Sequence, residues 1–378
     1  MKTRIGLVFG GRSGEHEVSI RSAARVIRDI DKSRFSVLPI AIDQNGSWLD
    51  PTTSLTLLPP SAADLISDDA CSVNAESIAL IGDPRYKGLK NLTVANSENS
   101  LYRIDVFFPV LHGTFGEDGT IQGLFEMADV PYVGCGVLSS ACGMDKVAMK
   151  QLFAANGLPI CRYVWFLRSQ WERMPDGIVK MVEEKIGYPC FVKPANLGSS
   201  VGVSMAADAE HLKSAIAKAA EYDRKIIVEE ALQMREIECA VMGNENPQAS
   251  TPGEYIIRNK QKAFLDYTEK YSGTGNNEFV TPAPVSEELA EKIREYAVAA
   301  FKAIDGSGLS RVDFFLRTDN GALLVNEINT MPGLTEASGF PKMWAASGLE
   351  FTEVISRLID LAVEKHQEKA KNKTYRDD

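Results

Sequence analysis

Two carboxylates and one amide, those of Asp313, Glu327 and Asn329, stand among apolar residues near the C-terminal end of the sequence. Asp313 and Glu327 fall in two strand-like runs, 311–317 and 322–328, which flank a Thr-Asp-Asn-Gly turn typical of a β-hairpin, and Asn329 directly follows the second run. Side chains on one face of a hairpin meet in pairs, and like charges that meet repel unless a cation lies between them. Because all three groups offer oxygen, the pattern predicts a site for Mg²⁺ or Mn²⁺.

The length of the hairpin loop decides whether these oxygens meet, since a shift of one residue turns every side chain of a strand to the other face. We expect a three-residue loop with Gly321 in the left-handed conformation. That register places Asp313 opposite Glu327, with Arg311 on the same face. Asn326 then points to the other face. A surface hairpin with solvated acids is the alternative interpretation.

A lysine and a glycine- and serine-rich segment, FVKPANLGSSVGVS, have the composition of a phosphate-binding loop. Lys193 ends a strand-like run, and the backbone and hydroxyl donors of Ser199 and Ser200 follow it. Donors of this kind cradle phosphates. The lysine precedes the glycines and a second strand follows, so the segment is not a Walker A loop. Without the lysine it would be interpreted as an ordinary hairpin turn.

Acidic residues at the end of the next apolar run suit the base and sugar of a nucleotide. The run KIIV leads into Glu229 and Glu230, where backbone groups could bind an adenine, and Glu236 could bind ribose hydroxyls. Paired glutamates at a strand edge are usually solvated, so this segment is a weak signal when taken alone.

Two further segments, GGRSGEHEVS and LHGTFGEDG, each follow an apolar strand and carry Glu15 and His112. The first has GGxxG rather than GxGxxG, which argues against a nicotinamide oxidoreductase. Ligands of parallel sheets bind at the carboxyl edge, so Glu15 could hold a substrate ammonium group there, with His112 beside it. Helix capping by Glu15 and a structural role for His112 are the alternatives.

A long polar stretch at residues 258–284 contains glycine and asparagine and little apolar patterning. Loops of this length inside compact domains are usually lids or disordered segments. Lys270 and Tyr271 lie at its centre and would be the working residues of a lid.

Composition limits the classes of protein to consider. A length of 378 residues fits two or three domains, and 44% hydrophobic and 24% charged residues are ordinary for a globular enzyme. The net charge of −10 argues against nucleic acid as the main partner, because phosphate neutralisation needs a basic face. Six scattered cysteines without a zinc spacing predict buried free thiols. Without a signal segment or an apolar run of ~18 residues, the sequence predicts a cytoplasmic protein with no membrane contact.

Strand and helix patterns alternate in the first third of the chain, with strands at 4–9, 35–42 and 106–111 and a helix at 18–30. This rhythm predicts a parallel, doubly wound α/β domain, interrupted by an irregular segment at 50–100. The remaining patterns predict a mixture of helices and sheet: a helix at 139–156, a strand at 161–167, a helix at 176–185, a strand ending at 193, a helix at 208–222, a strand at 225–230, mixed sheet from 237, and helices at 286–304 and 351–365.

Seven segments, taken in order, resemble signatures of the D-alanine–D-alanine ligase family of ATP-grasp enzymes: GGRSGEHEVS, LHGTFGEDG, VKPANLGSSVG, REIECAV, DYTEKY, RVDFF and NEINTMPG. The resemblance implies an ATP-grasp fold, in which two α+β subdomains clasp ATP, preceded by the doubly wound domain. The implied parts are 1–140, 141–227 and 228–378. It also implies a cytoplasmic homodimer that acts in peptidoglycan precursor synthesis.

The resemblance further implies a reaction in which ATP converts a first D-alanine to D-alanyl phosphate, and the amine of a second D-alanine then displaces phosphate. By this match, Glu15 holds the ammonium of the first D-alanine with His112 nearby, and Ser199 and Tyr271 orient that amino acid. Arg311 and the Gly333 amide stabilise the oxyanion. Ser338 receives the carboxylate of the second D-alanine. Those matched to ATP neutralise phosphates or hold the nucleoside; they are Lys146, Lys193, Ser200 and Lys270, then Glu229, Glu230, Glu236 and Phe264. Two Mg²⁺ or Mn²⁺ ions would be held by Asp313, Glu327 and Asn329.

The sequence also departs from the family pattern and leaves other functions open. Gly339 and Phe340 stand where a larger apolar residue and a tyrosine are expected, and Met205 stands where lysine is common. Tyr271 favours an amine acceptor, but a D-alanine–D-lactate ligase is an alternative. A non-catalytic ATP-binding protein of the same fold is another.

Overall fold

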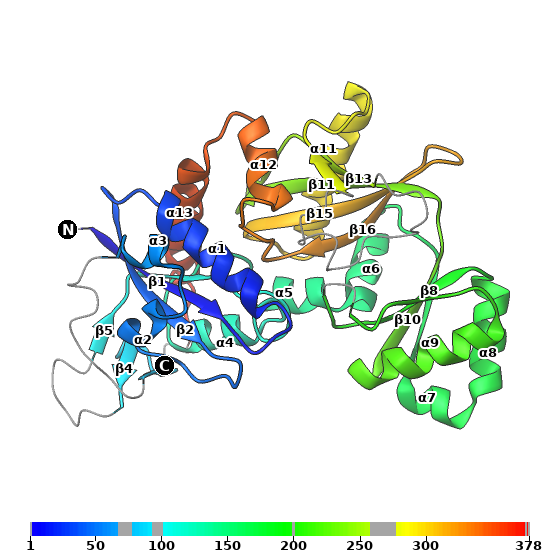
Figure 1. Cartoon of the computed structure of the whole chain (residues 1–378), viewed down its shortest axis with the longest axis horizontal. Helices are drawn as coiled ribbons and strands as arrows, with labels where there is room; N and C mark the ends of the chain where they lie inside the picture. Colours follow the sequence, from blue (N-terminus) through cyan, green and yellow to red (C-terminus); the bar gives the residue numbers. More distant parts are fainter. Residues whose placement is uncertain are drawn as a thin grey trace.

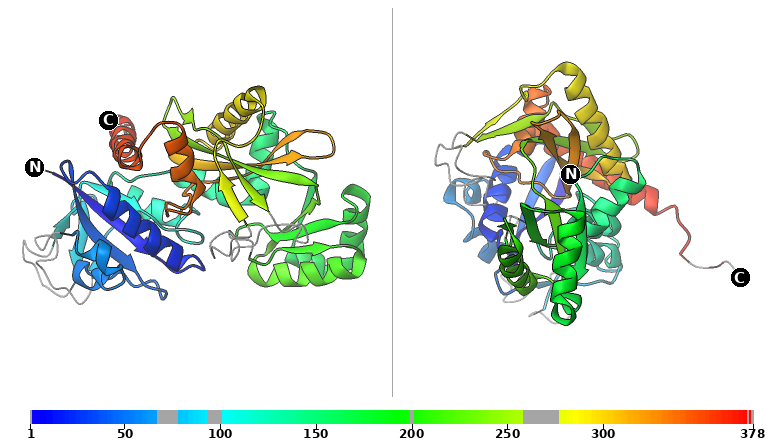
Figure 2. Two further views of the ribbon diagram at one scale, coloured as in Figure 1. Left: turned by 45° about the horizontal axis from the view of Figure 1, so that its top comes forward. Right: turned by 90° about the vertical axis from the view of Figure 1, so that its right-hand side faces the viewer.

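The computed structural model of the chain describes residues 2–66, 78–92, 101–198, 201–257, 277–374 and 376. Two lobes joined at the centre give an elongated molecule (Figures 1 and 2). The described residues form four sheets.

A parallel sheet in the order β2-β1-β6 forms the core of the first lobe. Helix α1 and the C-terminal helix α13 cover one face of it, and α4 covers the other, so the predicted doubly wound α/β domain is confirmed. The elements are β1 (Thr3–Gly10), β2 (Phe35–Ile42), β6 (Val106–Pro109), α1 (His16–Asp29), α4 (Thr120–Met127) and α13 (Phe351–Lys369).

The segment predicted to be irregular contains regular structure instead. Short helices α2 (Pro51–Leu55) and α3 (Pro60–Ala63) precede an antiparallel sheet β3-β4-β5. Its strands are β3 (Ile78–Leu80), β4 (Gly88–Asn91) and β5 (Leu101–Arg103). Apolar side chains of these short strands pack into the core that also lies under β2, so tertiary burial stabilises what the sequence pattern alone leaves weak.

The single helix predicted over 139–156 is two helices, α5 (Val137–Met144) and α6 (Lys146–Ala155). Asp145 separates them. Its carboxylate caps α6 by accepting hydrogen bonds from the backbone amides of Val147 and Ala148, and it forms an ion pair with Lys225. The break places Lys146 at the first position of α6.

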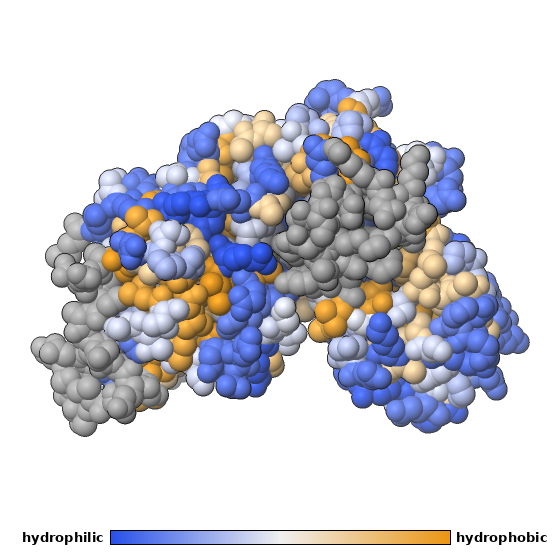
Figure 3. Space-filling view, viewed as in Figure 1, coloured by the Kyte–Doolittle hydropathy of each residue, from blue (hydrophilic) through white to orange (hydrophobic). Residues whose placement is uncertain are grey.

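An antiparallel sheet in the order β7-β10-β8-β9 forms the second lobe, with α7, α8 and α9 on it. The outward faces of these helices are hydrophilic (Figure 3). The elements are β7 (Tyr163–Leu167), β8 (Cys190–Pro194), β9 (Ser204–Ala206), β10 (Lys225–Glu230), α7 (Arg168–Arg173), α8 (Pro175–Lys185) and α9 (Ala209–Tyr222). The predicted second strand after the glycine-rich turn is β9.

A six-stranded sheet lies between the lobes, in the order β14-β13-β11-β15-β16 with β12 paired to β11. Helices α6 and α11 pack on one face, and α12 and α13 pack on the other. Helix α12 has no counterpart among the elements predicted from the sequence. The elements are β11 (Met234–Gly243), β12 (Gln248–Ala249), β13 (Gly253–Ile257), β14 (Asn277–Val280), β15 (Gly308–Arg317), β16 (Leu323–Asn329), α11 (Glu287–Ala303) and α12 (Gly339–Ala346).

The predicted parts at 1–140, 141–227 and 228–378 remain a prediction. Strand β10 crosses the second boundary, and α13 packs on the sheet of the first part. Of the six cysteines, the five in the described ranges are free thiols, four of them buried, as expected; Cys71 lies outside those ranges. No helix in the described ranges is long and apolar enough to cross a bilayer.

Candidate active site

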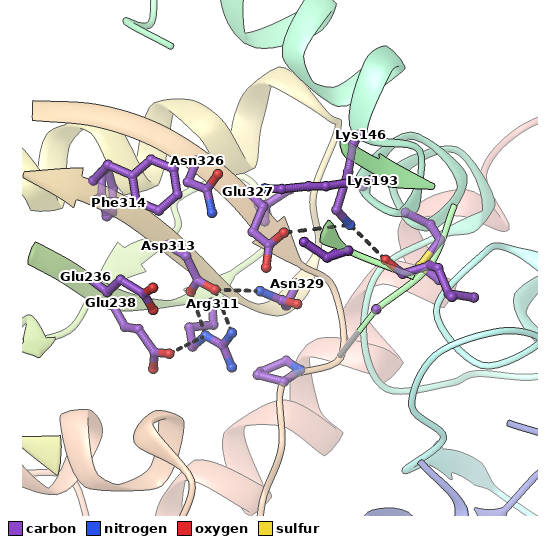
Figure 4. A pocket seen from close by; sticks show the side chains of 18 of the residues that line it. Lys146, Lys193, Glu236, Glu238, Arg311, Asp313, Phe314, Asn326, Glu327 and Asn329 are labelled. Carbon is purple, nitrogen blue, oxygen red and sulfur yellow. Dashed lines mark hydrogen bonds and ion pairs between the residues drawn. The ribbon is translucent and has the colours of Figure 1, made fainter. Parts of the chain in front are cut away.

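A pocket lies where the hairpin, the four-stranded sheet and the carboxyl edge of the parallel sheet meet (Figure 4). Most of the predicted site residues line it; these are Glu15, His112, Lys146, Lys193, Glu229, Glu230, Glu236, Arg311, Asp313, Glu327, Asn329 and Gly333. Ser199, Ser200, Phe264, Lys270 and Tyr271 lie outside the described residues, as does the centre of the predicted lid.

The hairpin has the predicted strand pairing at the end away from its loop, but the loop itself differs from the prediction. Arg317 and Ala322 close a four-residue loop, since the Arg317 amide donates to the Ala322 carbonyl at 2.9 Å. The three-residue loop is therefore wrong, although Gly321 has the expected positive φ of 73°. Even so, Asp313 lies opposite Glu327, because the pairing register shifts by one residue between Phe314 and Asp313.

This shift is a β-bulge in β16, and Asn326 is the additional residue. Val325 and Ile328, three positions apart, both belong to the apolar core under the sheet. Asn326 and Glu327 between them both line the pocket (Figure 4), so the prediction that Asn326 points away is wrong. The bulge offsets the extra loop residue, and this compensation brings the two carboxylates to one face.

In this structure cationic and amide groups of the protein contact the hairpin carboxylates. Arg311 makes two hydrogen bonds of 2.6 Å to Asp313, and the Asn329 amide nitrogen donates to the same carboxylate at 3.1 Å. Lys146 Nζ lies 3.7 Å from Glu327 Oε2. These contacts balance charge that would otherwise be repulsive.

The donor set of the hairpin fits a hard divalent cation. Two carboxylates and an amide offer oxygen ligands that suit Mg²⁺ or Mn²⁺. No group of three or more His, Cys, Asp and Glu side chains suited to a metal occurs in the described ranges. An ion held here would therefore take further oxygens from phosphate or water, which is usual for Mg²⁺.

A third carboxylate, Glu238, was not predicted. It lies on β11 directly opposite Asp313, lines the pocket, and its Oε1 is 3.3 Å from Arg311 Nε. Period-two alternation from Glu236 places both glutamates on one face of β11, and this signal in REIECAV could have identified it.

Glu229 and Glu230, which were predicted to lie near the nucleotide base, have partners within the protein. Glu229 is buried and accepts a hydrogen bond from Lys193 at 2.7 Å. Burial would raise the pKa of Glu229, but neighbouring lysine ammonium groups lower it to about 2. Glu230 accepts from the backbone and guanidinium of Arg162, each at 2.8 Å.

His112 connects the first lobe to the loop after the hairpin. Its Nδ1 is 3.0 Å from the Met331 carbonyl and its Nε2 is 3.3 Å from Ser22 Oγ, which in turn accepts from the Leu334 amide. Burial lowers the pKa of His112, so the neutral ring donates from Nδ1 and accepts at Nε2. Both nitrogens are engaged, which gives this histidine a role in positioning the loop that carries Gly333.

Ser338 is apart from the other predicted residues. It is buried at the N-terminus of α12 and does not line the pocket. Its hydroxyl lies 2.8 Å from that of Thr335 and accepts from the Thr335 amide. A Cβ at the neighbouring Gly339 would lie 2.5 Å from Glu238 Oε2 and 2.8 Å from the Phe279 ring. The absence of a side chain at Gly339 therefore leaves space for both the carboxylate and the ring.

Glu117 also lines the pocket and was not among the predicted site residues, although it belongs to LHGTFGEDG. It accepts a hydrogen bond of 2.9 Å from the Gly113 amide. Burial raises the pKa of Glu117 to about 8, with a further contribution from the Glu15 carboxylate. The side chain is therefore protonated at neutral pH and adds no charge beside Glu15.

Replacing Glu117 with glutamine is expected to remove a pH-dependent loss of stability. The folded protein holds this proton with a pKa of about 8, against 4.5 for the ordinary carboxyl. The contribution of Glu117 to stability therefore falls as pH rises from 4.5 to 8, and Glu117→Gln lacks this pH-dependent contribution. Melting temperatures in EDTA should favour the variant increasingly between pH 5 and pH 8.5. A difference that is the same at both pH values would contradict the raised pKa.

Comparison with known proteins places these residues in a family. The model "D-ala D-ala ligase N-terminus" matches residues 4–135 and "D-ala D-ala ligase C-terminus" matches 152–360. D-Alanine–D-alanine ligases of Heliobacterium modesticaldum and Ruminiclostridium cellulolyticum are 46% and 47% identical, over 100% and 97% of this chain and 99% and 97% of theirs.

Solved structures agree. A D-alanine-D-alanine ligase from Coxiella burnetii is 35% identical with a TM-score of 0.80, covering 98% of both chains. A D-Ala:D-Ser ligase from Enterococcus faecalis is 33% identical with a TM-score of 0.80, covering 96% of this chain and 100% of its own. The fold is that of an ATP-grasp enzyme, and the chain belongs to the D-alanine–D-alanine ligase family.

Proposed function

We propose that the protein joins two D-alanines into D-alanyl-D-alanine at the expense of ATP, through a D-alanyl phosphate intermediate. One observation carries this proposal: Lys146 and Lys193 line the same pocket as the hairpin carboxylates, and Glu15 lines it as well. Cations suited to phosphate, acids suited to a metal ion and an acid suited to an ammonium group therefore border one space.

In the first step, a carboxylate oxygen of one D-alanine attacks the γ-phosphorus of ATP, and ADP leaves. Glu15 would hold the ammonium of this D-alanine, with Ser199 and Tyr271 orienting it. Lys146 and Lys193 would neutralise phosphate oxygens, as would Ser200 and Lys270, because the reaction brings two anions together. Glu229, Glu230, Glu236 and Phe264 would surround the nucleoside.

In the second step, the neutral amine of another D-alanine attacks the acyl carbon, and phosphate leaves from the tetrahedral intermediate. Arg311 and the Gly333 amide would donate to the oxyanion, because fixed donors aimed at developing charge lower the barrier. Ser338 would receive the acceptor's carboxylate, which requires its hydroxyl to exchange Thr335 for substrate.

Asp313, Glu327 and Asn329 would hold two Mg²⁺ or Mn²⁺ ions, which neutralise phosphate charge when bound. The oxygen donor set and the bulge that brings the carboxylates together support this assignment. We further propose a cytoplasmic homodimer. Support for a dimer comes from Met127 and Leu138, apolar side chains 66% and 61% exposed on the contacting helices α4 and α5.

The proposal is tested by incubating the purified protein with ATP, Mg²⁺ and D-alanine. Phosphate release should depend on D-alanine and equal the dipeptide found by mass spectrometry. ATP binding without D-alanine-dependent phosphate release would overturn it and leave a non-catalytic ATP-binding protein.

The acceptor needs its own arm of the assay, because one structural relative is a D-Ala:D-Ser ligase. D-Lactate and D-serine should be offered in competition with D-alanine at neutral pH. We expect the dipeptide of D-alanine to predominate. A predominant ester would identify a D-alanine–D-lactate ligase instead.

A further inference from the structure

A buried lysine on α6 lies beside the pocket without lining it. Lys150 follows Lys146 by one helical turn, and its side chain is 1% exposed. Its Nζ lies 3.0 Å from Glu229 Oε1, 3.5 Å from Cys161 Sγ and 3.3 Å from the Asn326 carbonyl oxygen. A charge buried this completely is unfavourable unless it is paired, so these contacts must offset its desolvation.

The first contact completes a buried charged triad. Glu229 lies between two ammonium groups, with Oε1 facing Lys150 and Oε2 accepting from Lys193. Burial alone would lower the pKa of Lys150, but the Glu229 carboxylate raises it above the ordinary value. All three groups are therefore ionised, and the triad keeps one positive charge.

That remaining charge matters because Lys193, unlike Lys150, lines the pocket. If Lys150 were absent, Glu229 would pair with Lys193 alone and cancel its charge towards the pocket. With Lys150 present, the carboxylate is shared, and a net positive charge faces the space where phosphate would lie.

The contact between Lys150 and the Asn326 carbonyl supports the bulge in β16. This strand is the outer strand of its sheet, so its outer backbone groups need partners that are not strands. Groups from α6 and from the segment before β7 supply them; the pairs are Val325 N with Pro159 O, Ile328 N with Met149 Sδ, and Asn326 O with Lys150 Nζ. Lys150 thus holds the carbonyl of the bulge residue, directly before Glu327.

We propose that Lys150 is a positioning residue for the ligation. It leaves the charge of Lys193 available to the nucleotide phosphates, and it fixes the bulge that brings Glu327 opposite Asp313. This inference rests on the proposed function, which assigns Lys193 to phosphate and the two acids to the metal ion.

The test compares three substitutions, Lys150→Met, Lys150→Gln and Lys150→Arg. Binding of ADP in EDTA, measured by calorimetry, should weaken about tenfold or more in the two neutral variants, as expected for a lost charged interaction. The KM for ATP should rise in parallel while the KM for D-alanine changes little. The arginine variant keeps the charge and should bind ADP nearly as the wild type does.

A matched control is Phe153→Leu, a buried change one turn farther along α6 with no polar contact. It should lower the melting temperature and leave ADP binding unchanged, which separates a structural defect from lost charge. Glutamine provides a second neutral variant should methionine prevent folding. ADP binding equal to wild type in either folded neutral variant would overturn the proposal. Because ADP binding needs no D-alanine, failure of the wild type in the phosphate assay is a distinct result.

Discussion

Glu327→Gln is expected to lower turnover with D-alanine by about a thousandfold or more, because this carboxylate would hold a metal ion, and a bound metal ion stabilises the negative charge of the transition state. Asp313→Asn should have a comparable effect, since the two carboxylates lie opposite each other on one face. The measurement is kcat at saturating Mg²⁺, with Mn²⁺ affinity in the presence of ADP as a second readout.

Asp319→Asn is the matched control for these variants. This residue lies in the hairpin loop, where its carboxylate pairs with Arg317 away from the pocket. The same change of acid to amide there should leave kcat and Mn²⁺ affinity near wild type. Near-normal turnover in both pocket variants would disprove the metal assignment.

Arg311→Lys is expected to lower kcat by about a hundredfold or more, the usual effect of removing a donor from an oxyanion site. A lysine keeps the positive charge beside Asp313 and Glu238, but it lacks the planar pair of donors that the arginine presents. ATP affinity should change much less than kcat, because the role is assigned to the second chemical step.

Arg317→Lys provides the comparison on the same strand, where the guanidinium pairs with Asp319 outside the pocket. Its kinetic constants should match those of the wild type. If Arg311→Lys instead raises the KM for ATP and leaves kcat intact, Arg311 binds nucleotide and the oxyanion assignment is wrong.

The position of Asp313 opposite Glu327 was predictable from the sequence, but the β-bulge that produces it was not. Alternation in LLVNEIN indicates two faces, whereas the observed core positions Val325 and Ile328 are three apart. A bulge of this kind depends on partners from distant elements, including the Met149 and Lys150 side chains. No local pattern in the hairpin carries that information.

Other differences between the predicted and the observed structure have either local or long-range causes. The break at Asp145 was within reach of the sequence, because aspartate is a favoured N-cap and good caps mark helix starts. The role of His112 was not, since its partner Met331 is 219 residues away. The raised pKa of Glu117 likewise comes from burial that only the assembled pocket creates.

Helix α13 lies on the parallel sheet of the first lobe and shares one apolar core with β1, β6 and α1 (Figure 1). During synthesis the N-terminal part of the chain leaves the ribosome first, and domains often fold as they emerge. Here one face of the first sheet is covered only in part, by α1, until residues 351–369 have been synthesised. Completion of the first lobe therefore requires residues 351–369, and a nascent chain that has not reached them leaves part of this apolar core uncovered.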